Sequence, residues 1–119
     1  MAGRVRYSAP TNAAMDIEAL ETMIERGQDS AMLRLTLGNA YRQREDWEQA
    51  ETHLRQALTL KSDYSAAWKA LAKCLEARGR RDEAIQAYES GLEAARTNGD
   101  MQLVREMEVF LRRLRRSSD

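Results

Sequence analysis

The feature of this sequence that most constrains its fold is an internal repeat with a period of 34 residues. When residues 31–64 are placed on residues 65–98, residues of the same size class coincide. Size classes that match at a fixed period are typical of structural units that stack against one another. Small residues coincide at 38/72, 50/84 and 57/91, and large apolar residues at 37/71, 41/75, 54/88 and 58/92.

Each unit is predicted to contain two antiparallel helices, because Ala, Leu, Glu, Arg and Gln dominate the chain and its one proline is Pro10. Asp46, followed three residues later by Gln49, predicts an N-cap with a reciprocal partner at the start of a helix. Gly79 suits the left-handed position that ends a helix. The sequence therefore predicts an all-α fold, with helices at 31–44, 47–60, 65–78 and 81–95.

The pattern extends beyond the two full units. Residues 16–30 align with 50–64, so 13–27 are expected to form the second helix of a truncated repeat. Residues 100–116 carry apolar side chains at helical spacing and are expected to form a terminal cap. Residues 1–12 lack periodicity and are expected to form a disordered arm, which leaves one domain over 13–119.

Specific residues at fixed places in each unit carry a resemblance to a known family. In the order W-x2-L-G-x2-Y, one unit has Trp68, Leu71, Ala72 and Leu75, and the other has Arg34, Leu37, Gly38 and Tyr41; Ala50, Leu54, Ala57 and Ala84, Tyr88, Gly91 follow. Over residues 31–98 the sequence resembles the tetratricopeptide repeat family, although Arg34 replaces the usual tryptophan and Ser62 the usual proline. The resemblance implies a right-handed helix–turn–helix solenoid of two full repeats with flanking capping helices, which mediates protein–protein interaction without enzymatic activity.

Gly38 lies inside a predicted helix, where glycine costs roughly 1 kcal/mol relative to alanine. We interpret it as a packing residue that faces Ala50 and lets two helix backbones approach.

The resemblance also implies a concave groove, lined by the first helix of each unit, that binds extended peptides or partner helices. Arg42, Lys69 and Lys73 would give this groove a cationic middle, suited to an acidic peptide or helix of another protein. Solvated helix residues with no binding role are the alternative interpretation. The inward positions would be Met32, Leu35, Asn39, Arg42 and Gln43 in one unit, and Ala66, Lys69, Lys73 and Glu76 in the other.

Some family members bind acidic chaperone tails through a carboxylate clamp of Lys, Asn and Arg residues. Asn39 is the one match to that clamp. We therefore reject chaperone-tail binding, because Leu35, Ala70, Asp100 and Val104 occupy the other clamp positions.

Two further hypotheses stay open. The chain could self-associate as a homo-oligomer through an apolar edge of its terminal helices. It could also bind RNA or phosphate through Arg112, Arg113, Arg115 and Arg116. Against the second, 19 basic and 19 acidic residues create no global field that favours nucleic acid or a membrane, and no aromatic platform accompanies the arginines.

Catalysis finds little support in the sequence. His53 is the one histidine and is expected at the surface, while Cys74 is expected to be a small packed residue, and neither has the clustered partners of a metal site. Trp68 is expected in the core and Trp47 in the core or half-buried. We therefore predict no enzymatic activity, no cofactor and no metal. Neither a secretory signal nor a run of 18 apolar residues is found in the sequence, so the cytoplasm is the expected location.

Overall fold

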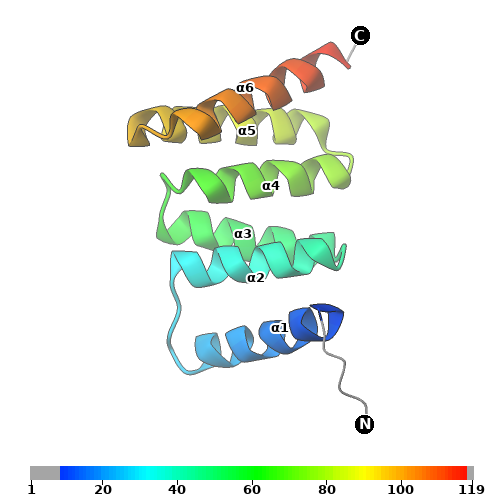
Figure 1. Ribbon diagram of the computed structural model, residues 1–119, viewed down its shortest axis with the longest axis vertical. Coiled ribbons are helices and arrows are strands. Elements are labelled where there is room, and N and C mark those ends of the chain that lie inside the picture. Colours follow the sequence, from blue (N-terminus) through cyan, green and yellow to red (C-terminus); the bar gives the residue numbers. More distant parts are fainter. Residues whose placement is uncertain (1–8, 118–119) are drawn as a thin grey trace.

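The computed structural model describes residues 9–117, with side chains from residue 17 onward, and contains six helices and no strand over that range. Figure 1 shows the helices stacked in chain order along the longest axis, with α1 and α6 at opposite ends. This is an all-α helical-repeat solenoid. The helices are α1 (Ala9–Glu25), α2 (Ala31–Gln43), α3 (Trp47–Leu60), α4 (Ser65–Ala77), α5 (Arg81–Asn98) and α6 (Met101–Arg116).

The N-terminal helix begins earlier than predicted. Helix α1 starts at Ala9, so the expectation of a disordered arm is wrong for residues 9–12. Pro10 lies in the first turn of the helix, where its fixed φ is compatible with helical geometry and its missing N–H needs no partner. Residues 1–8, the rest of the predicted arm, lie outside the described residues.

Side-chain caps define three of the helix starts. Each cap is an oxygen that accepts a hydrogen bond from the backbone N–H three residues later, which satisfies one of the donors left free at a helix N-terminus. The caps are Ser30 Oγ to Leu33 N at 3.1 Å, Asp46 Oδ1 to Gln49 N at 3.4 Å, and Asp100 Oδ1 to Leu103 N at 3.2 Å.

The predicted cap at Asp46 is confirmed, but its reciprocal partner is not. The backbone N–H of Asp46 donates to the carbonyl of Tyr41 at 3.0 Å, so it is already satisfied by the end of the preceding helix. Gly79 has a φ of +78°, as predicted for a helix-ending glycine. Gly99, with a φ of +77°, ends α5 in the same way, three residues beyond the predicted end of that helix.

The close approach predicted at Gly38 is present. A Cβ atom added to Gly38 would lie 2.5 Å from Cδ2 of Leu54 and 3.4 Å from the carbonyl oxygen of Ala50. The side chain of Leu54 therefore occupies the space that a larger residue at position 38 would need, and Leu54 itself is fully buried. Gly38 is thus a packing residue of the α2–α3 pair.

Ion pairs between repeats identify two opposite faces of the solenoid. Lys69 of α4 pairs with Glu106 of α6, and Arg55 of α3 pairs with Glu83 of α5. Because α2 also packs against α4, the first helices of the two repeats share one surface with α6, which we call the α2–α4–α6 face. The second helices share the other surface, which we call the α3–α5 face.

The two tryptophans lie at the edge of the core. Trp47 is half-buried, as expected, but Trp68 is also half-buried, so its assignment to the core is wrong. The indole Nε1–H of Trp68 donates to the carbonyl of Ser62 at 2.8 Å, which anchors the ring near the surface. Among the helices of residues 9–117, none is both long and apolar enough to cross a membrane.

Candidate functional site

The residues predicted to line the groove belong to α2 and α4, whose exposed surfaces meet on the α2–α4–α6 face. Their burial differs. Gln43, Met32 and Ala66 are exposed, and Leu35 packs its half-buried side chain against the hydrophobic core. The remaining groove residues are also half-buried; they are Asn39, Arg42, Lys69, Lys73 and Glu76.

Arg42 and Asn39 interact within α2. Nε and Nη2 of Arg42 donate to Oδ1 of Asn39 at 3.3 and 3.2 Å, so the guanidinium is held across one helical turn. No carboxylate among the described side chains forms a salt bridge with Arg42. Its positive charge therefore remains uncompensated while its orientation is partly defined.

Lys73 is a second cation without a carboxylate partner among the described side chains. Its Nζ lies 3.9 Å from the centroid of the Phe110 ring, within the range of a cation–π contact. Burial and then the neighbouring Lys69 lower the pKa of Lys73, and Arg42 and Arg113 lower it further, while Glu76 opposes them. Lys73 is thus surrounded mainly by positive charge in a partly dehydrated position.

Lys69 does not contribute a free charge to the predicted cationic middle. Nζ of Lys69 lies 2.7 Å from Oε1 of Glu106, and the hydrogen bond from Lys69 holds the pKa of Glu106 below its usual value. The sequence could not show this pairing, because the two residues are 37 positions apart. The cationic middle is therefore reduced to Arg42 and Lys73.

Glu76 ties three helices together. Its Oε1 accepts a hydrogen bond from the hydroxyl of Tyr88 at 2.6 Å, and its Oε2 lies 3.3 Å from Nη2 of Arg113. Burial and then Glu76 raise the pKa of Tyr88. Glu76 therefore has a structural role that the sequence did not indicate.

Phe110 is a residue of this face whose role sequence reasoning missed. Phe110 is one of the apolar residues of the predicted cap at 100–116. Its ring lies against Nζ of Lys73, and its ring centroid is 5.4 Å from that of Tyr88. The guanidinium of Arg113 lies 5.3 Å from the same ring. A single aromatic residue in a basic helix is the one signal that could have pointed to it.

The C-terminal arginines are partly used in ion pairs. Arg113 pairs with Glu76 of α4, and Arg115 pairs with Glu89 of α5. These contacts fasten α6 to the preceding repeat. Two of the four arginines therefore serve packing, which weakens the hypothesis of a phosphate or RNA site.

The two residues considered for catalysis are both buried. His53 is 9% exposed, so its predicted surface position is wrong, and Cys74 is fully buried, as predicted. The thiol of Cys74 donates to the carbonyl of Trp47 at 3.2 Å, and burial raises its pKa, which disfavours the reactive thiolate. Within residues 17–117, no group of three or more His, Cys, Asp or Glu side chains could hold a metal ion.

Stacked antiparallel helix pairs that repeat every 34 residues define a helical-repeat protein. The tetratricopeptide repeat family model matches residues 41–107, and the chain belongs to this family. Proteins of this family are generally non-enzymatic scaffolds for protein–protein interaction.

Two relatives are close in sequence. The TPR repeat-containing protein PA0015 of Pseudomonas aeruginosa is 46% identical over 103 residues, which cover 87% of this chain and 98% of the relative. The solution structure of protein BPP2914 from Bordetella parapertussis is 50% identical and has a TM-score of 0.75, with 85% of this chain and 88% of that chain covered.

More distant structures share the fold. PcrH, solved in complex with the chaperone binding region of PopD, is 15% identical with a TM-score of 0.74, and the match covers 97% of this chain and 99% of that one. The first TPR of Spaghetti (RPAP3), bound to the HSP90 peptide SRMEEVD, is 20% identical with a TM-score of 0.66, and the match covers 88% and 91%.

Proposed function

We propose that the α2–α4–α6 face binds an acidic peptide or helical segment of another protein. The observation that carries the proposal is the pair Arg42 and Lys73, two half-buried cations that form no salt bridge with the described carboxylates. A partly dehydrated charge without an ion-pair partner raises the free energy of the folded protein. A carboxylate from a partner would pair with these charges and lower that free energy.

The neighbouring side chains suit the rest of such a segment. The guanidinium of Arg42 has donors left for a bidentate contact with a carboxylate. The amide nitrogen of Asn39 can donate to a peptide carbonyl, since its oxygen already accepts from Arg42. Leu35 offers half-buried apolar surface one turn away from Asn39, where a partner's apolar side chain would gain by burial.

The other predicted groove residues have supporting roles in this proposal. Lys69 and Glu76 are held by α6 through Glu106 and Arg113, so they form the wall of the face rather than its contact points. Gln43 is exposed at the end of α2 and can add a polar contact at the rim.

The distant relatives offer a precedent for the type of ligand. PcrH and the first TPR of Spaghetti were each solved with a segment of another protein, PopD and an HSP90 peptide respectively. The chaperone-tail clamp itself is still not our proposal for this chain. Val104 is 4% exposed and Asp100 is the N-cap of α6, so neither is placed to hold a terminal carboxylate.

The proposal is tested by neutralising the two cations. Wild-type protein and the double variant Arg42→Gln/Lys73→Gln are used as baits in a lysate, and the captured proteins are quantified by mass spectrometry. We expect the specific partner to bind the double variant about thirtyfold more weakly, because two charge contacts are lost and each is worth roughly 1 kcal/mol at a partly exposed site.

A matched control removes two cations elsewhere. Arg26 and Arg112 are exposed and form no salt bridge in the described structure. Arg26 follows α1, and Arg112, although it belongs to α6, lines a cavity with Arg96 of α5 instead of contacting Arg42 or Lys73. Arg26→Gln/Arg112→Gln should capture partners like the wild type. If the Arg42→Gln/Lys73→Gln bait retained every partner at wild-type levels, the α2–α4–α6 face would not be the binding site.

A further inference from the structure

A groove lies on the opposite surface of the solenoid, between α3 and α5. Three adjoining cavities share one residue, Trp68, whose indole forms part of the lining of each. Leu71 and Leu75 of α4 continue the floor, and α3 and α5 form the two sides. The first cavity has a volume of about 480 Å³, within the roughly 300–1,000 Å³ of ligand sites.

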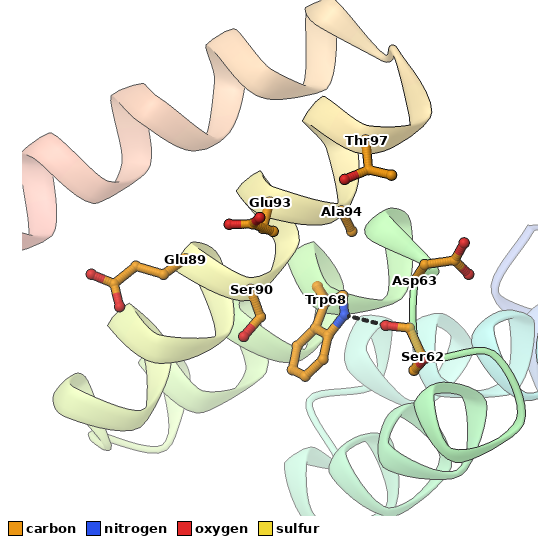
Figure 2. Close-up of a pocket in the computed structure, with 8 residues that line it drawn as sticks. All are labelled: Ser62, Asp63, Trp68, Glu89, Ser90, Glu93, Ala94 and Thr97. Carbon is orange, nitrogen blue, oxygen red and sulfur yellow. Dashed lines mark hydrogen bonds between the residues drawn. The ribbon is translucent and has the colours of Figure 1, made fainter.

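Trp68 is held in a fixed position at the centre of this groove. Figure 2 shows it between α5 and the α3–α4 loop, with Ser90 and Glu93 on one side and Ser62 and Asp63 on the other. Its Nε1–H donates to the carbonyl of Ser62 at 2.8 Å, so the polar edge of the ring is satisfied. A half-buried indole whose orientation is already defined loses little conformational freedom on binding.

Helix α5 packs closely against the first carbon of the Trp68 side chain. A Cβ atom added to Gly91 of α5 would lie 2.8 Å from Cβ of Trp68, which shows how closely α5 already packs against this side chain. The absence of a side chain at Gly91 permits this close contact between α4 and α5. The half-buried ring of Trp68 lines the groove beside this contact.

The charge of the first cavity identifies the class of ligand. Three carboxylates and no basic side chain line it, the carboxylates being those of Asp63, Glu89 and Glu93. Asp63 pairs with the exposed Lys61, and Glu89 pairs with Arg115. Glu93 forms no salt bridge within the described structure.

We propose that the α3–α5 groove docks a basic segment of a partner protein, with a lysine or arginine side chain placed over the indole of Trp68. Tryptophan is the aromatic side chain that attracts a cation best, and tryptophan and arginine are both enriched among the hot spots of interfaces. Glu93 pairs with the incoming charge, and apolar residues that flank the cation pack along Trp68 and Ala94.

This assignment gives the two faces opposite preferences. The α2–α4–α6 face has two unpaired cations, whereas the first cavity of the α3–α5 groove has only carboxylates as its charged lining. Helix α4 contributes to both sites, but with different residues, Lys73 on one face and Trp68 in the groove, so an acidic and a basic segment would not compete for the same side chains. The basic-segment site stands independently of the function proposed for the other face.

The test selects peptides from a random 12-residue display library against the full chain. Enriched peptides are then synthesised and titrated into ¹⁵N-labelled protein. We expect one class of enriched peptides to contain lysine or arginine beside apolar residues, and to shift the indole N–H signal of Trp68 but not that of Trp47. Glu93→Lys should weaken this class about tenfold or more, because it reverses one charge at the contact.

Glu18→Lys provides the matched control. Glu18 is an exposed glutamate of α1 that forms no salt bridge in the described structure, so its reversal changes the net charge equally without touching the groove. Binding of the basic class should be unchanged in this variant. Glu93 is also exposed, so neither substitution is expected to disturb the fold.

Four outcomes would overturn the proposal: enriched basic peptides that leave the Trp68 signal unmoved, equal affinity for wild type and Glu93→Lys, recovery of acidic peptides alone, or no enrichment at all. Self-association would also refute a separate partner. It would appear as concentration-dependent sedimentation of the chain without peptide, and its loss in Glu93→Lys would assign the groove to a second copy of this chain.

Discussion

The guanidinium of Arg34 lies 3.0 Å from Nδ1 of His53, an imidazole that is only 9% exposed. Because a guanidinium can only donate, Nδ1 accepts this hydrogen bond, so the ring is neutral in this arrangement. Arg34 is fixed in turn by Asp29, which accepts from its Nε and Nη2 at 2.9 Å each. The His53 ring stacks on the Tyr41 ring, with 5.5 Å between the ring centroids. Asp29, Arg34 and Tyr41 thus connect the α1–α2 loop and α2 to the imidazole of α3.

The free energy of unfolding should therefore fall as the pH drops below about 6.5. Burial lowers the pKa of His53, and Arg34 lowers it further, so the folded value lies below the ordinary 6.5. Between these two values the unfolded chain binds more protons than the folded chain, and stability decreases with falling pH. Urea unfolding at about pH 7.5 and about pH 5.5 measures the loss for wild type and for His53→Gln, which cannot titrate there. An identical loss in both proteins would contradict this role of His53.

Glu51 should be a major contributor to stability. It is 8% exposed, and its carboxylate accepts from Arg55, Arg78 and Arg80 at 2.8, 2.7 and 3.1 Å. Burial acts to raise the pKa of Glu51, but the three guanidiniums together lower it, so the carboxylate is ionised and links α3 to the α4–α5 turn. We expect Glu51→Gln to reduce the free energy of unfolding by about 1–3 kcal/mol, because one neutral oxygen replaces a charged acceptor.

The exposed Glu48, one turn away on the same helix, is the control for Glu51. Chemical denaturation should show a change within about 0.5 kcal/mol for Glu48→Gln. Equal effects at both positions would mean that the arginine cluster contributes nothing measurable.

Gly38→Leu should destabilise the protein by about 1–3 kcal/mol through overpacking. Even the Cβ atom would lie 2.6 Å from Cγ of Leu54, well inside the range that atoms tolerate. Combining it with Leu54→Ala should recover part of the loss, because the cavity left by Leu54 accepts the new side chain. Thermal unfolding of the two single variants and the double variant checks this, and purely additive losses would contradict a direct clash.

Glu45→Gly should stabilise the protein by about 0.5–1 kcal/mol. Glu45 has a φ of +59°, in the left-handed region, and the residue 34 positions later is Gly79 with a φ of +78°. The left-handed conformation strains a non-glycine residue by roughly 1–2 kcal/mol, and a glycine removes this strain. Part of the gain is lost again, because glycine gives the unfolded chain more conformational freedom. Glu45→Ala, which keeps the strain, should leave the urea midpoint nearly unchanged, and an equal gain in both variants would contradict the backbone explanation.

The sequence predicted the fold well because the relevant information is local and periodic. Four of the six helices end within one residue of their predicted boundaries. Helix α5 continues to the left-handed Gly99, and α1 begins earlier than predicted, with Pro10 in its first turn, and ends at Glu25. Gly38 and Gly79 were interpreted correctly, since a tight helix contact and a left-handed turn each require a specific residue type. The tetratricopeptide repeat family follows from the same positions.

The candidate sites were predicted less completely, because their state depends on partners distant in the chain. Lys69 was taken as a free cation, but Glu106 of α6 neutralises it. His53 was expected at the surface, which is wrong because Arg34 and Tyr41 of α2 contact the imidazole. Trp68 was expected in the core, which is wrong because its indole is half exposed between α3 and α5. Neighbours contributed by other repeats cannot be read from the period itself.

By itself, then, the sequence determined the repeat, the helices and the small residues at their crossings, since helix propensity, capping and size matching act over a few residues or one fixed period. Only the tertiary structure decided which charges remain unpaired. Lys69 and Lys73 are both lysines of α4, but α6 places the carboxylate of Glu106 in hydrogen-bond contact with Lys69 and the ring of Phe110 against Lys73. Electrostatic pairing depends on distances of a few ångströms, which folding sets.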